Sequence, residues 1–119
     1  MLNLKEITVQ HSGVAMKLAI VTGRDLGVKE DGTKGSQSAP VRHVWEAASQ
    51  NGLKVAPAGI ALTAAEVVAG LGIKSNVHVA CQPTDGMVHY IAPDGSVNNY
   101  PPNLDARHSP DVHYLFALE

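Results

Sequence analysis

Polar residues gather in the segment from Lys74 to Gln82, and their side-chain types suit contact with nucleic acid. Asparagine and glutamine can hydrogen-bond adenine edges, and lysine can meet a phosphate or a guanine. If this segment is a helix lying in a groove, its DNA contacts come from Lys74, Ser75, Asn76, His78 and Gln82. A single basic residue is few for such a helix, so we expect further phosphate contacts from Arg42 and Lys54.

Histidines and the single cysteine offer a second kind of chemistry. Cys81 follows His78 by three residues, and an imidazole beside a thiolate activates it as a nucleophile, with Asp85 available as an orienting carboxylate. A lone cysteine among valines and alanine is, however, typical of an inert core position. Adding His89 or His113 does not give the paired spacing of a structural zinc site. We predict no metal, no cofactor and no catalytic residue, with thiol chemistry at Cys81 and His78 ranked third.

The stretch 23–35 follows an apolar segment and is rich in glycine, as phosphate-binding loops are. It lacks the Gly-Lys-Ser/Thr ending and does not open directly into a helix, so the backbone cradle and the magnesium ligand are missing. We exclude nucleotide binding on this ground. Residues 23–39 are predicted to form a long flexible connection, a length that is uncommon in compact domains unless the loop is mobile or functional.

Composition and charge limit the class of protein. A chain of 119 residues with 45% hydrophobic and 17% charged residues is typical of one compact folded domain over residues 1–119. The longest apolar stretch, residues 55–71, is broken by Pro57 and Glu66, so we expect no membrane span. The first residues lack a secretory-signal pattern and a single cysteine suits a reducing compartment, which together predict a cytoplasmic protein.

Local patterns predict the elements that must position these residues. Residues 5–10 alternate Ile7 and Val9 with polar residues, and residues 14–22, after a His-Ser-Gly turn, are rich in β-forming residues, so the two segments predict an N-terminal hairpin within residues 1–22. An apolar stripe at helical spacing predicts a helix over 41–51. Residues 87–92 and 96–100 flank a Pro-Asp-Gly turn and predict a second hairpin. The alternation of residues 112–118 favours a buried strand, although a helix capped by Ser109 fits almost as well.

A further helix is predicted from Thr63 through Leu71, because Thr63 followed by Glu66 forms a capping box and Gly72 can end the helix. The whole segment Thr63-Ala64-Ala65-Glu66-Val67-Val68-Ala69-Gly70-Leu71-Gly72-Ile73 resembles the first helix and turn of helix-turn-helix repressors and winged-helix regulators. In such proteins a Leu-Gly-Ile turn leads into the recognition helix, the glycine supplying a left-handed backbone. The resemblance covers residues 40–100, with helix 41–51 as support and hairpin 87–100 as wing.

The resemblance implies an α+β fold: a small single domain with two or three helices, two β-hairpins and a C-terminal strand around a winged-helix-like core. It also implies a small sequence-specific regulator of transcription that binds double-stranded DNA as a homodimer. One structural question stays open. Val77 and Val79 alternate with polar residues as in a strand, and His78 falls where a recognition helix has an apolar anchor, so residues 76–82 are either a helix or a core strand.

A second function, from a different class, is a non-enzymatic protein-interaction or inhibitor module of phage or mobile-element type. Residues 84–119 hold one Lys or Arg against five Asp or Glu, so the segment 101–119 is acidic while the body is mildly basic. An acidic face with Asp94, Asp105 and Asp111 could meet a basic partner. Alternatively, the hairpins could present an edge for strand addition, and the arms around Ile7 and Val9, or residues 112–118, could pair between chains.

Overall fold

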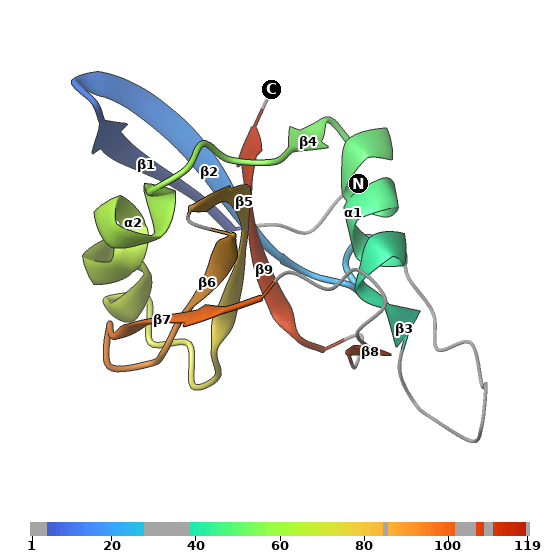
Figure 1. Cartoon of the computed structure of the whole chain (residues 1–119). Coiled ribbons are helices and arrows are strands. Elements are labelled where there is room, and N and C mark those ends of the chain that lie inside the picture. Colours follow the sequence, from blue (N-terminus) through green and yellow to red (C-terminus); the bar gives the residue numbers. More distant parts are fainter. Residues whose placement is uncertain (1–4, 28–38, 85, 102–106, 109–110, 119) are drawn as a thin grey trace.

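The structure is a computed structural model that describes residues 5–27, 39–84, 86–101, 107–108 and 111–118. The elements in chain order are β1 (Lys5–His11), β2 (Val14–Thr22), β3 (Ala39–Pro40), α1 (Val41–Gln50), β4 (Leu53–Lys54), α2 (Ile60–Ala69), β5 (Val77–Thr84), β6 (Met87–Ile91), β7 (Val97–Tyr100), β8 (Arg107–His108) and β9 (His113–Leu118). Six strands follow one another across the main sheet in the order β1-β2-β9-β5-β6-β7, and β4 joins the sheet through β9 (Figure 1). Strands β3 and β8 form a separate short pair.

Strand β9 lies at the centre of the main sheet. It pairs antiparallel with β2 on one side and parallel with β5 on the other, and its last residues pair with β4. The four residues from Tyr114 to Ala117 are all buried. Continuous burial of this kind arises because both faces of the sheet are covered at this point, whereas a strand with one solvated face alternates.

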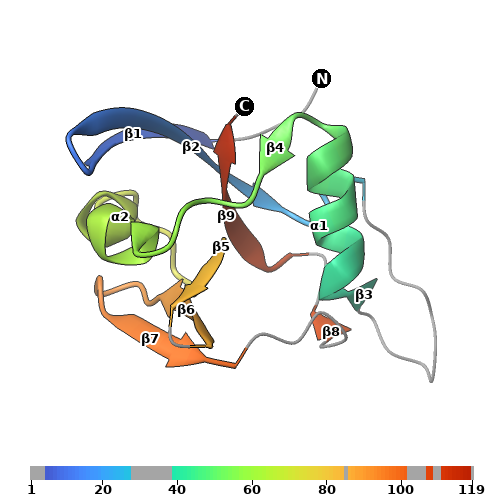
Figure 2. The same ribbon diagram turned by 45° about the horizontal axis from the view of Figure 1, so that its top comes forward.

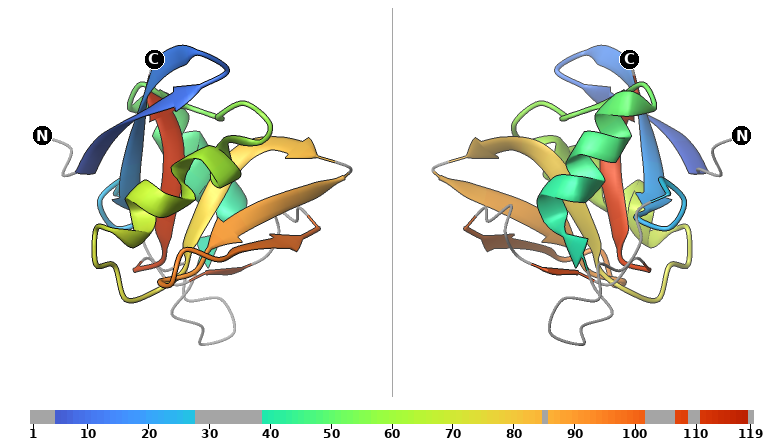
Figure 3. Two further views of the ribbon diagram at one scale, coloured as in Figure 1. Left: turned by 90° about the vertical axis from the view of Figure 1, so that its left-hand side faces the viewer. Right: turned by 90° about the vertical axis from the view of Figure 1, so that its right-hand side faces the viewer.

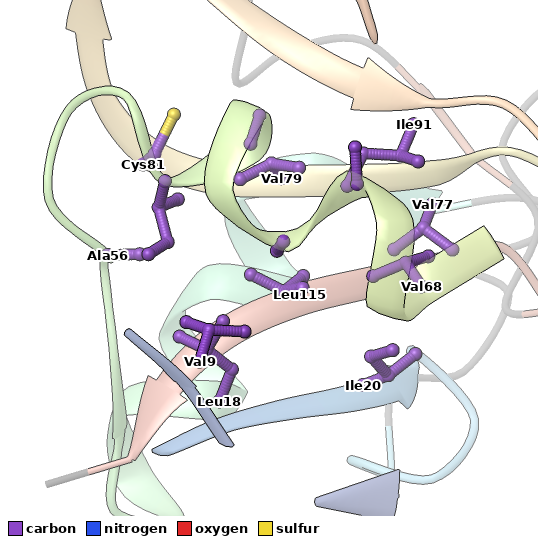
Figure 4. Packing of buried hydrophobic residues seen from close by; sticks show 14 of the residues in the cluster. Val9, Leu18, Ile20, Ala56, Val68, Val77, Val79, Cys81, Ile91 and Leu115 are labelled. Atoms are coloured by element: carbon purple, nitrogen blue, oxygen red, sulfur yellow. The ribbon is translucent and has the colours of Figure 1, made fainter. Parts of the chain in front are cut away.

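The two helices cover opposite faces of the sheet, α1 on one side and α2 on the other (Figures 1 and 2). Leu115 and Ala117 of β9 belong to the cluster under α2, and Tyr114 and Phe116 belong to the cluster under α1. Figure 4 shows Leu115 between Leu18 and Val79 below α2. None of the helices in the described ranges is long and apolar enough to cross a membrane.

The burial of the first hairpin follows from what covers it. Strand β1 alternates, with Ile7 and Val9 buried and their neighbours exposed, because α2 covers only one face of this strand. Strand β2 becomes buried on both faces from Leu18 to Val21, where α1 and α2 pack from opposite sides. Among the described strands, residues Val14 to Lys17 of β2 pair only with β1, so this end of the hairpin extends past β9.

The predicted winged-helix core is wrong. Residues 77–84 form strand β5, with Val77 and Val79 buried in the sheet, so no recognition helix follows Gly72. The predicted wing, residues 87–100, joins the main sheet instead, with β6 pairing on β5 and β7 pairing on β6. The described residues form a mostly β fold with only two short helices. Valine on both sides of His78 favours an extended backbone, and packing in the sheet agrees with that local preference.

Several local predictions are confirmed. The hairpin predicted over 5–10 and 14–22 corresponds to β1 and β2, and the helix predicted over 41–51 corresponds to α1. The second hairpin and the last strand correspond to β6, β7 and β9. The capping box is wrong: α2 begins at Ile60 after Gly59, whose φ is 81°, and Thr63 lies inside the helix. Of the predicted connection 23–39, residues 28–38 lie outside the described ranges.

Candidate functional site

Three of the residues predicted to contact DNA line one hollow. Ser75, Asn76 and His78 surround a space of about 300 Å³ together with Asp111 and Val112. The parallel strands β5 and β9 begin side by side here, since Val77 pairs with His113. We call this space the β5–β9 hollow. Lys74, the residue before it, is exposed.

Polar side chains at the β5–β9 hollow form hydrogen bonds with other side chains. Ser75 Oγ lies 3.1 Å from His113 Nδ1, and Arg24 Nε donates to Asp111 Oδ1 at 2.9 Å. The hydrogen bond from Arg24 holds the pKa of the Asp111 carboxyl below its usual range. A serine, a histidine and an aspartate thus come close, but an exposed serine and a carboxylate already bound by arginine are typical of a surface network rather than of an activated nucleophile.

Aromatic rings fill the sheet beside the β5–β9 hollow. His78 Nδ1 lies 3.2 Å from the hydroxyl of Tyr100, and the His78 ring lies within 5.9 Å of the rings of Tyr90, Tyr100 and Tyr114, centroid to centroid. Burial raises the pKa of Tyr100 to about 12 and raises that of Tyr114 as well. His78 is therefore part of a packed aromatic cluster on the face of the sheet opposite α2. A side chain that contacts DNA would instead have to be accessible to the solvent.

The remaining residues predicted to contact DNA lie elsewhere. Arg42 is in the first turn of α1, and Lys54 is in β4, where it borders a second hollow with Trp45 and Phe116. Gln82 is in β5, and its side chain lies outside the described part of the chain. The predicted basic contacts thus come from α1, from β4 and, for Lys74, from the segment between α2 and β5, and no helix brings them together.

Cys81 and His78 do not form an activated pair. Cys81 is 1% exposed in the cluster under α2 (Figure 4). His78 packs against tyrosine rings on the other face of the sheet. Burial raises the pKa of the Cys81 thiol, which is the direction opposite to activation. Across the residues that the structure describes, no three His, Cys, Asp or Glu side chains come together in a way that could hold a metal ion.

A second candidate site is the outer edge of β1, by which we mean the side of this strand that faces away from β2. Strand β1 is the first in the sheet order and pairs only with β2 among the described elements (Figures 1 and 3). Its register with β2 is regular over all seven residues, from Lys5 opposite Ile20 to His11 opposite Val14. No bulge or proline interrupts it.

The turn at the end of the hairpin fixes which groups point outward. Ser12 and Gly13 both have positive φ, 53° and 78°, as in the type I′ turn that connects tightly paired strands. A two-residue turn closes on a hydrogen-bonded pair, here His11 and Val14, and such pairs alternate along the ladder. The backbone N–H and C=O groups of Glu6, Thr8 and Gln10 therefore point to the outer edge.

Side chains of the hairpin end and of α2 support this edge. His11 Nδ1 lies 3.0 Å from Thr63 Oγ1. Two exposed apolar side chains lie at the same end: Val14, opposite His11, is 61% exposed, and Leu62, next to Thr63, is 74% exposed. The observation that marks this site is therefore the unpaired backbone of β1 itself, because such an edge can pair with another strand.

The sequence predicts some features of these two candidate sites and not others. The alternation around Ile7 and Val9 indicates a hairpin whose arms can pair between chains, but nothing in the pattern tells which strand ends the sheet. The other arm considered for pairing, residues 112–118, is the central strand β9 and has partners on both sides. The contacts of Arg24 with Asp111 and of Ser75 with His113 join positions far apart in the chain, which no local pattern reports.

Comparisons of the chain with protein-family models, with curated proteins and with solved structures give no match. Its function is therefore inferred from the geometry of these two sites.

Proposed function

We propose that this chain is a non-enzymatic protein-interaction module that binds an extended segment of its partner by strand addition at the outer edge of β1. The observation that supports it is the edge itself: seven residues in regular register, with no described element on the outer side. An unpaired edge presents a row of donors and acceptors that another strand can satisfy.

An unprotected edge is informative because most proteins protect the edge strands of their sheets. Proteins usually protect an edge by shortening it, kinking it, or adding proline or inward-pointing charge. The opposite edge of this sheet follows that rule, since β7 has only four residues and Pro101 comes directly after it. Strand β1 has its charges, Lys5 and Glu6, at one end, and its middle carries no such protection.

The side chains of β1 indicate what the partner strand should contain. Ile7 and Val9 face the α2 side of the sheet and are only 8% and 6% exposed. A strand added beside them places its own alternate residues over the same apolar surface, so apolar residues at every second position are favoured.

Binding to duplex DNA stays a prediction from the sequence. That prediction depended on a recognition helix after Gly72, whereas residues 77–84 form strand β5. Exposed Lys74 lies in the segment between α2 and β5, exposed Lys54 lies in β4, and the ring of His78 is packed among tyrosines. Strand addition is favoured because its donors and acceptors come from one continuous element.

Selection from a random peptide library on the immobilised chain tests the proposal. We expect the selected peptides to alternate apolar and polar residues and to shift the backbone amide resonances of residues 5–11. Thr8→Pro should abolish this binding, because proline removes an outward-pointing N–H. The chain should still fold, since that N–H is not part of the ladder with β2. Thr8→Val keeps the N–H and is the matched control.

Three results would overturn the proposal. The first is that no peptide is selected. The second is that bound peptides shift resonances at the β5–β9 hollow and leave β1 unchanged. The third is that the Thr8→Pro variant binds the same peptides as well as the Thr8→Val variant does. A parallel measurement with duplex DNA separates the two functions, because binding that weakens steeply with salt would favour the DNA-binding prediction.

A further inference from the structure

We infer that the partner strand at the outer edge of β1 is β1 of a second copy of this chain, running antiparallel about a two-fold axis through Thr8. This inference rests on the proposed strand addition and names its partner. Homodimers with a two-fold axis use the same patch on both subunits, so the patch must be complementary to itself. Strand β1 meets that condition in one register better than in its neighbours.

Register follows from which backbone groups point outward. Around a two-fold axis through Thr8, Thr8 faces Thr8 of the second copy, and Glu6 faces Gln10 of the second copy. These are the three residues whose N–H and C=O groups point to the outer edge, so each facing pair can exchange two hydrogen bonds. An axis through Ile7 or through Val9 leaves one of the three without a facing partner inside the strand.

Side chains agree with the same register. Facing residues in this register place their side chains on the same face of the sheet. Ile7 therefore lies beside Val9 of the second copy, on the α2 side of both sheets. The apolar surface of one hairpin then continues into the next. On the opposite side the exposed carboxylate of Glu6 faces the neutral amide of Gln10. No two carboxylates and no two ammonium groups face each other along the seven residues, whereas like charges directly opposite would be destabilising.

A charge swap at Glu6 and Gln10 tests this register. Gln10→Glu places a carboxylate opposite Glu6 twice in each dimer, so we expect a dissociation constant about two- to thirtyfold larger. Adding Glu6→Lys to the same chain converts both like-charge pairs into opposite-charge pairs and should restore dimerisation to at least the original level. Glu6→Lys alone is the control. Its new lysine faces neutral Gln10 of the second copy. Within each subunit it replaces the exposed contact of Glu6 with Lys17 by two exposed like charges, a change that is the same in the monomer and in the dimer, so we expect little change in the dissociation constant.

Sedimentation equilibrium over a range of protein concentrations measures these constants, and circular dichroism verifies that each variant folds. We expect a concentration-dependent dimer, weakened by Gln10→Glu, recovered in the double variant and lost in Thr8→Pro. A dimer that is insensitive to all these changes would mean that copies meet elsewhere and would overturn the inference. So would a chain that stays monomeric at every concentration. If such a monomer still binds selected peptides at β1, the inference fails while the proposed function stands.

Discussion

His11 of β1 and Thr63 of α2 lie 3.0 Å apart, Nδ1 to Oγ1, although 52 positions separate them in the chain. This contact joins the end of the hairpin that extends past β9 to the helix that covers its apolar face. It also gives Thr63 a different role from the one its sequence suggests, since the residue holds the edge strand in place instead of opening the helix.

Removing the Thr63 hydroxyl should weaken this connection. Thr63→Val keeps the shape of the side chain and loses one partly buried hydrogen bond, so we expect the free energy of unfolding to fall by about 0.5–1.5 kcal/mol. Chemical denaturation measures it. Combining this change with His11→Ala in a double-mutant cycle should give effects that are clearly less than additive. Fully additive effects would mean that Thr63 acts on α2 alone.

Glycines at the two ends of α2 should respond differently to alanine. Gly59 precedes the helix with φ 81°, so Gly59→Ala strains the backbone and should cost about 1–2 kcal/mol of stability. Gly70 follows the helix with φ −69°, and an added Cβ meets only ordinary contacts there. Gly70→Ala should therefore be neutral or stabilising by up to about 1 kcal/mol. Thermal or chemical unfolding compares the two variants, and equal effects would contradict the helix start at Ile60.

Alkaline pH should destabilise the fold through its buried tyrosines. Burial raises the pKa of Tyr100 from its ordinary value near 10 to about 12, and the pKa of Tyr114 moves in the same direction. The unfolded chain then loses these protons first, so the free energy of unfolding falls as pH rises from about 10 to about 12. Tyrosine absorbance during an alkaline titration detects the late ionisation. Tyr100→Phe should reduce the slope, and a slope that does not change would contradict the burial of Tyr100.

The thiol of Cys81 should be unreactive in the folded chain. It is the single cysteine, it is buried, and burial raises its pKa. With Ellman's reagent at neutral pH we expect modification slower than for a free thiol by on the order of a hundredfold or more, since reaction requires opening of the core. Denaturant should restore the ordinary rate. Rapid modification of the native chain would contradict the burial of Cys81 and would support thiol chemistry at Cys81 and His78.

Local patterns in the sequence specify most of the elements but not their arrangement. The alternation of Ile7 and Val9 and the stripe of Val41, Val44 and Ala48 are short-range signals, and the structure agrees with both. The start of α2 was missed because Thr63 and Glu66 match a capping box, whereas the helix begins after Gly59 in a left-handed conformation. That conformation is open to glycine and leaves no distinct spacing in the sequence.

Long-range pairing explains the larger error. Strand β9 enters the sheet between β2 and β5, and no feature of residues 113–118 indicates that position. Because the sequence does not show that β9 lies beside residues 77–79, it gives no sign that Val77 and Val79 belong to a sheet. The resemblance of residues 63–73 to a helix-turn-helix therefore favoured a recognition helix. The candidate edge at β1 depends on the same order of strands, because only the whole sheet shows which strand has an open side.

Amide hydrogen exchange at Thr8 tests the central claim most directly. In the free chain the Thr8 N–H points to the outer edge, so it should exchange fast while the amides of Ile7 and Val9, bonded to β2, are protected. When a strand is added, whether the second copy at high concentration or a selected peptide, protection of Thr8 should rise to the level of its neighbours. Exchange at Thr8 that stays fast under both conditions would contradict binding at this edge.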